Sequence, residues 1–156
     1  MNKLARSSIL RFVILVSTSA MFLACEEDTS IKIDGKNPPS FSLSGSGALI
    51  SFGVTEVPPE NQRQTIQRRS DVNIPLWFIE PTNGDNKIWR LPSITYGKVP
   101  PGFTQQFPAD GSVPAQLKEG KIYEAGGGAS QANGELIWFK VQGDRTIQIP
   151  IPGRNQ

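Results

Sequence analysis

The sequence contains no histidine, and its 156 residues include a single cysteine, Cys25. Histidine is the commonest general base in enzymes and the commonest protein ligand of transition metals, so both roles lose their usual residue. A Ser-His-Asp triad is therefore excluded, and a structural zinc ion lacks cysteine and histidine ligands. Ser130 lies between small residues, but the final glycine of a nucleophile elbow is missing. We expect no catalysis, no metal and no cofactor.

Strong charge of either sign is also missing. The formal net charge is +2, and three of the 16 basic residues are Lys3, Arg6 and Arg11, near the start of the chain. The remainder carries 13 basic and 14 acidic residues and is close to neutral. Domains that bind nucleic acid usually present a basic surface, so we expect no nucleic-acid partner.

Helical periodicity is nearly absent. The chain has 15 glycines and 13 prolines, which divide it into short segments. Apolar and polar residues alternate within several of these segments, as is typical of half-buried strands. The clearest alternating runs are residues 41–43, 50–54, 137–141 and 147–151. The glycine triplet at 126–128 predicts a flexible loop between two strands.

One apolar run stands out near the start of the chain. Residues 12–24 are thirteen mostly apolar residues, preceded by basic residues and no acidic one. A membrane-spanning helix needs about 20 apolar residues. A basic start, a short apolar run and a small residue before the cleavage site are typical of a secretory signal peptide. We therefore expect residues 1–24 to be a cleaved signal peptide.

The end of this run, Met-Phe-Leu-Ala-Cys at residues 21–25, resembles the lipobox of bacterial lipoproteins, in which a small residue precedes a cysteine. The resemblance covers residues 1–25. It implies cleavage between Ala24 and Cys25, with lipid on the Cys25 thiol and on the new amino group. It also implies a membrane-anchored location in the bacterial cell envelope, and leaves inner and outer membrane open. An ordinary signal peptide with an unrelated cysteine is the alternative.

The rest of the chain divides into a tether, a domain and a tail. Residues 25–39 are mostly polar and end in two prolines, which predicts an exposed tether after the lipidated cysteine. Residues 40–152 predict one domain, long enough to bury a core without disulfides. Residues 153–156 predict a short tail.

Leu117, Gly120 and Tyr123 resemble the corner between strands E and F of fibronectin type III domains, where a leucine, a turn glycine and a tyrosine follow at this spacing. In such sandwiches the tyrosine hydroxyl bonds to the backbone just upstream. The resemblance and the short alternating segments together predict an all-β fold. We expect an antiparallel immunoglobulin-like β-sandwich of about seven short strands.

The expected function is that of a lipid-anchored envelope protein that presents its β-sandwich for binding or assembly. The membrane is one partner, and another envelope protein or a glycan is a further one. The alternative is a carbohydrate-binding module or a small glycan-acting enzyme. Trp89, Tyr96 and Phe103 form a stacking surface for sugars if their rings are exposed, although aromatic residues on strands more often pack into the core.

Overall fold

The structure is a computed structural model that describes residues 28–59, 73–83, 86–91, 93–130 and 134–152. The side chains of Ile74 and Trp89 are outside the description as well. Ala24 and Cys25 lie outside the described residues, so the predicted cleavage and lipid attachment rest on the sequence.

Nine strands and one short 3-10 helix, η2 (Ile88–Arg90), make up the described part of the fold. The strands are β1 (Ser30–Ile33), β2 (Ser40–Ser44), β3 (Ala48–Val57), β4 (Ile74–Pro81), β5 (Ile94–Thr95), β6 (Phe103–Phe107), β7 (Ile122–Ser130), β8 (Leu136–Gln142) and β9 (Arg145–Ile149).

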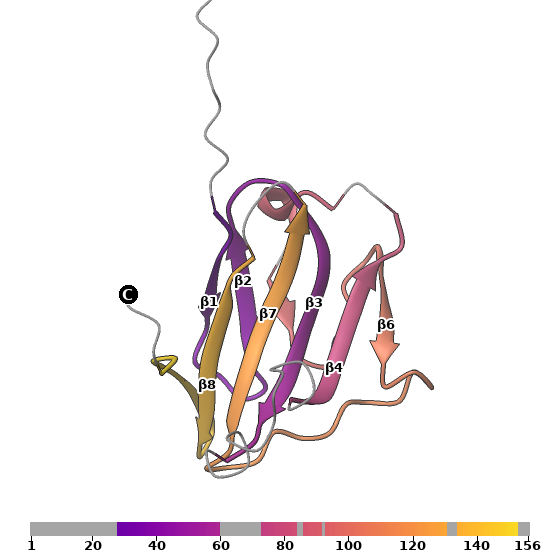
Figure 1. Ribbon diagram of the computed structural model, residues 1–156. Coiled ribbons are helices and arrows are strands. Elements are labelled where there is room, and N and C mark those ends of the chain that lie inside the picture. The colour runs from indigo at the N-terminus through magenta and orange to yellow at the C-terminus, as the bar shows by residue number, and fades with distance from the viewer. Residues whose placement is uncertain (1–27, 60–72, 84–85, 92, 131–133, 153–156) are drawn as a thin grey trace, which may run out of the picture.

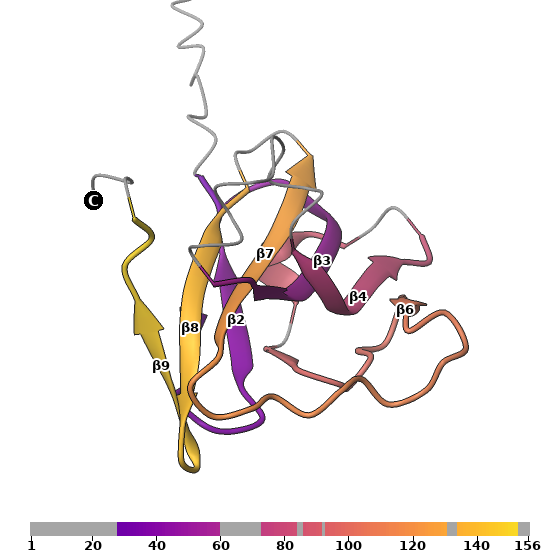
Figure 2. The same cartoon turned by 60° about the horizontal axis from the view of Figure 1, so that its bottom comes forward.

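The strands form two antiparallel sheets that pack face to face (Figures 1 and 2). The smaller sheet has the order β1-β2-β5, and the larger has the order β6-β4-β3-β7-β8-β9. The predicted all-β antiparallel sandwich is therefore confirmed. The described chain has nine strands rather than about seven, because β6 and β9 extend the larger sheet at its edges.

The core lies between the two sheets and is centred on Phe41 of β2. The Phe41 ring lies 5.2 Å from the ring of Phe52 on β3 and 5.7 Å from that of Phe139 on β8. All three side chains are fully buried. Successive side chains of a strand point to opposite faces, so the alternating runs at 41–43 and 137–141 turn one face of their strands toward this aromatic centre.

Residues 30–39 belong to the sandwich rather than to a tether. β1 pairs with β2, Ile31 is 4% exposed, and Pro39 is fully buried. The prediction of a tether over residues 25–39 is thus wrong for most of its length. Residues 30–33 within it, Ser-Ile-Lys-Ile, alternate polar and apolar side chains as a strand does. This short alternation is hard to recognise in the sequence because the residues on both sides of it are polar. The domain already begins at Thr29, which is 5% exposed.

The glycine triplet at 126–128 also differs from its prediction, because it lies inside β7 and pairs with β3. At Gly126 and Gly127, neighbouring side chains occupy the space that a side chain would fill. A Cβ on Gly126 would collide with Cδ2 of Leu136, and one on Gly127 would lie 2.9 Å from Cδ1 of Leu49. The triplet is therefore a packing feature of a strand and not a flexible loop.

The sandwich has two ends, which the orientation of Figure 1 places above and below. The upper end carries the β2–β3 loop (residues 45–47), the residues after β4 and the end of β7. The lower end carries the β1–β2 turn (residues 34–39), the β8–β9 turn (residues 143–144) and the segment 115–121. The backbone N–H of Thr146 in β9 donates to the carbonyl of Gly35 at 3.0 Å, so β9 is attached to the β1–β2 turn.

Candidate functional site

The predicted corner residues come together at the lower end. The backbone N–H of Lys118 donates to the Tyr123 hydroxyl at 2.7 Å, and this hydroxyl is 3.3 Å from the Lys118 carbonyl, to which it donates. Tyr123 is 1% exposed and Leu117 is 4% exposed, and burial raises the pKa of the Tyr123 hydroxyl. Gly120 has a φ of +74°, a conformation that favours glycine. These hydrogen bonds hold the segment between β6 and β7, which connects two strands of the larger sheet.

The predicted aromatic stacking surface is not formed by Tyr96 and Phe103. Their side chains are only 6% and 7% exposed. The Tyr96 ring packs edge-on against Trp77 at 5.7 Å, and its hydroxyl donates to the carbonyl of Ala115 at 2.7 Å. Both rings face the core, so neither presents a face to a sugar. The backbone of Trp89 lies in η2, and its side chain is outside the described part.

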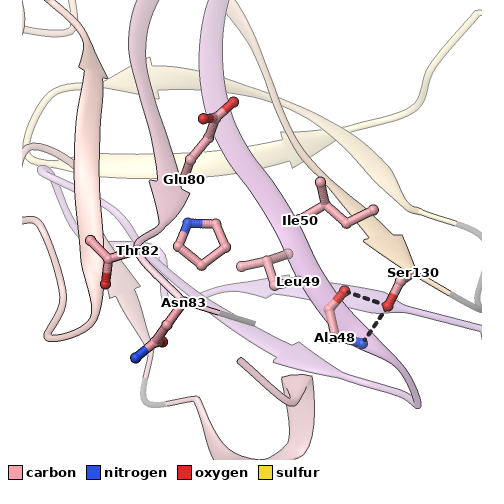
Figure 3. A pocket seen from close by; sticks show the side chains of 8 residues that line it. Ala48, Leu49, Ile50, Glu80, Thr82, Asn83 and Ser130 are labelled. Carbon is pink, nitrogen blue, oxygen red and sulfur yellow. Dashed lines mark hydrogen bonds between the residues drawn. The ribbon is translucent and has the colours of Figure 1, made fainter. Parts of the chain in front are cut away.

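The upper end contains a cleft that the sequence analysis did not predict. β3 and β4 stay paired only as far as Phe52 and Ile79. Beyond that point the N–H of Leu49 bonds instead to the carbonyl of Asn86 at 2.9 Å, so β4 diverges from β3. The strands open a hollow of about 540 Å³ (Figure 3). Its lining residues are Ala48, Leu49, Ile50, Glu80, Pro81, Thr82, Asn83 and Ser130.

Two hydroxyl groups of this cleft are hydrogen-bonded to backbone groups. The Ser130 hydroxyl accepts from the backbone N–H of Ala48 at 3.3 Å and lies 3.4 Å from the carbonyl of Ala48 (Figure 3). The Thr82 hydroxyl donates to the carbonyl of Gly102 at 3.0 Å. Among the described residues that line the cleft, Glu80 is the only one with an ionisable side chain, and it is exposed. General acid–base catalysis needs a positioned proton donor or acceptor at a reacting atom. Within this lining, the Glu80 carboxylate is the one candidate for that role.

A second hollow of about 300 Å³ lies at the lower end, beside the β1–β2 turn. Its lining is mainly apolar, and Val113 at its rim is 85% exposed. The lining residues are Asn37, Pro38, Tyr96, Gly97, Lys98, Val113, Pro114, Gln116 and Leu117. The hollow is therefore built against the same segment that forms the corner.

The outward face of the larger sheet exposes single apolar side chains. Ile50 on β3 is 54% exposed, Phe107 on β6 is 39% exposed, and Ile147 on β9 is 41% exposed. These three strands are not neighbours in the sheet, so the side chains are scattered. Isolated apolar residues are normal on a protein surface and do not indicate a binding patch.

Three further observations complete the description of the chain. Within the described ranges, no three His, Cys, Asp or Glu side chains gather where they could hold a metal ion. The same ranges contain no helix of the length and apolarity that crossing a membrane requires. Comparison with protein-family models, with curated proteins and with solved structures found no match for this chain.

Proposed function

We propose that this protein is a lipoprotein of the bacterial cell envelope. Lipid on Cys25 anchors it to a membrane, and its β-sandwich serves as a binding or assembly module without catalysis. The observation that carries the proposal is the position of the only cysteine, directly after a thirteen-residue apolar run and four residues before the buried Thr29.

The anchor explains the single cysteine. An exported protein with one cysteine has no partner for an internal disulfide, and lipid attachment gives that thiol a use. Two or more acyl chains supply a stable hold on a membrane, since each buried methylene contributes ~0.8 kcal/mol. The sandwich that follows then needs no membrane-spanning segment of its own to stay at the surface.

A binding role is supported by what lines the two hollows. The upper cleft has Glu80 as its ionisable side chain, and the lower hollow has Lys98 and the buried Tyr96. In the upper cleft the hydroxyls of Ser130 and Thr82 are hydrogen-bonded to backbone groups, whereas covalent catalysis usually pairs the nucleophile with a base. Surface hollows with a few polar groups and apolar walls fit contacts with another molecule.

Substitution of the cysteine tests the proposal. In a bacterial host that is fed a labelled fatty acid, we expect the natural chain to carry the label and to lose residues 1–24. The variant Cys25→Ser should lack the label and keep its leader, as read by intact mass. Ser17→Ala, within the same leader, is the matched control and should behave like the natural chain. An unchanged mature mass in Cys25→Ser would refute the lipoprotein assignment.

A further inference from the structure

The segment between the cysteine and the folded domain is very short. Only Glu26, Glu27 and Asp28 separate Cys25 from Thr29. Thr29 is 5% exposed and lies against the β2–β3 loop, since a Cβ on Gly45 would come within 2.8 Å of its Cα. The chain thus leaves the domain at the upper end, as Figure 1 shows.

The reach of this segment can be compared with the length of the sandwich. Four residue steps from Cys25 to Thr29 span at most about 14 Å, because an extended chain covers at most ~3.6 Å per residue. β3 has ten residues and runs from the upper to the lower end. At ~3.3 Å per residue it spans about 30 Å. If the lower end of the sandwich faced the membrane, Thr29 at the upper end would lie about 30 Å above the membrane surface. This distance is about twice what the segment from Cys25 to Thr29 can span.

The two side-on orientations differ in the reach that they need. Thr29 precedes β1 of the smaller sheet, and packed sheets are about 10 Å apart. If the outer face of the larger sheet lay on the membrane, this separation and a layer of side chains would use the whole reach of the segment. If the outer face of the smaller sheet lay on the membrane, both ends of the sandwich would be equally close to the headgroups, which the reporters described below distinguish from contact at the upper end.

We propose that the upper end rests on the lipid headgroups, held there by the short segment after Cys25, so that the cleft between β3 and β4 opens at the membrane surface. This inference rests on the proposed lipid anchor. The upper end suits the position because it combines the exposed Ile50 with the neutral side chains of Thr82 and Asn83. The lower end, with its apolar hollow around Val113, points away from the membrane.

The orientation can be measured with single introduced cysteines, because lipid blocks the thiol of Cys25. Asn83→Cys and Ile50→Cys place a reporter at the upper end, and Asp144→Cys and Gln142→Cys place one at the lower end. All four positions are exposed. Each lipidated variant is labelled with a small fluorophore and inserted into phosphatidylethanolamine–phosphatidylglycerol vesicles whose headgroups carry a nitroxide quencher. Far-ultraviolet circular dichroism establishes that each variant is folded.

We expect at least about threefold stronger quenching at the upper positions than at the lower ones, given the ~30 Å between the ends. Equal quenching at both ends, or stronger quenching at the lower end, would overturn the orientation. A Gly/Ser insert of about 20 residues after Asp28 extends the mean reach to roughly 25 Å and should remove most of the difference. An unchanged difference would overturn the role assigned to the short segment.

The intact mass of each reconstituted protein separates this inference from the proposed function. If the mass shows no lipid on Cys25, both the proposed anchor and the proposed orientation are wrong. If the mass shows lipid and the reporters are quenched equally, the anchor stands and only the orientation is wrong.

Discussion

The hydroxyl of Tyr123 accepts a hydrogen bond from the backbone N–H of Lys118 at 2.7 Å, five residues upstream. The same hydroxyl lies 3.3 Å from the Lys118 carbonyl, to which it donates. One side chain thereby satisfies both backbone groups of a residue in the segment that leads from β6 to β7 within the larger sheet. Because Tyr123 also stacks 5.5 Å from Phe139, the hydrogen bonds tie this segment to the core.

Removing that hydroxyl should destabilise the domain. Tyr123→Phe keeps the ring and leaves the Lys118 backbone groups without their partner, so we expect a loss of about 1–3 kcal/mol in the free energy of unfolding. Urea unfolding of the unlipidated chain from residue 26 measures it. Tyr96→Phe removes a hydroxyl that donates to the carbonyl of the exposed residue Ala115, and should cost less, about 0.5–1.5 kcal/mol. An unchanged urea midpoint for Tyr123→Phe would show that the corner does not stabilise the fold.

In the segment between β6 and β7, Leu117 should contribute more to the stability of the fold than Val113 does. It is 4% exposed and belongs to the core, so Leu117→Ala should cost about 2–5 kcal/mol through lost burial and a cavity. Val113, four residues earlier, is 85% exposed, and Val113→Ala should change stability by less than about 0.5 kcal/mol. Urea midpoints of the two variants, measured side by side, test the contrast. Similar losses in both would mean that the whole segment, and not Leu117, carries the packing.

Alkaline pH should destabilise the domain through its two tyrosines. Burial raises the pKa of Tyr96 and of Tyr123 above the ordinary value. An acid whose pKa is higher in the folded state stabilises that state fully below the unfolded pKa, near 10, and less as the pH rises above it. The urea midpoint should therefore be lower at pH about 11 than at pH about 8, with the loss beginning near pH 10. Tyr96→Phe should show a smaller fall than the natural chain, and an equal fall would contradict the role of Tyr96.

The fold class could be predicted because alternation is a local property of the sequence. Residues 50–54 and 137–141 lie in β3 and β8, and their alternate side chains reach the core except for Ile50, which is 54% exposed beside a register shift in β3. The last strand shows the limit of this reasoning. Ile147 is 41% exposed whereas Thr146 is buried, because Ile147 pairs with Lys140 on the outward face. The register set by the β8–β9 turn decides the face, and alternation alone does not reveal it.

Features that depend on distant partners could not be predicted. β1 became a strand because β2 lies beside it, and Tyr96 is buried because Trp77 from β4 covers it. The upper cleft has no motif at all, since it arises where β4 leaves β3 and residues 86–87 take its place. The proposed lipid attachment is different in kind, because the pattern that predicts it lies in the residues around Cys25 and does not depend on distant partners.

The glycine triplet yields the most specific prediction about packing. Gly127 and Gly128 are adjacent in β7, and their surroundings differ. A Cβ on Gly127 would lie 2.9 Å from Cδ1 of Leu49 and 3.0 Å from the carbonyl oxygen of Ser51, so both a side chain and the backbone of β3 would have to move. Overpacking of this kind typically costs about 1–3 kcal/mol. We therefore expect Gly127→Ala to lower the free energy of unfolding by that amount, measured by urea denaturation.

Gly128→Ala is the matched control for this prediction. The nearest atom to a Cβ on Gly128 is the Ser51 hydroxyl oxygen at 3.4 Å, which is ordinary contact, and the residue is exposed. Alanine also restricts the unfolded chain more than glycine does, which stabilises a protein by ~0.4–1 kcal/mol where the backbone allows it. Gly128→Ala should thus be neutral or stabilising. If Gly127→Ala proves as stable as Gly128→Ala, then β7 and β3 are not packed against each other as closely as the Gly127–Leu49 contact requires.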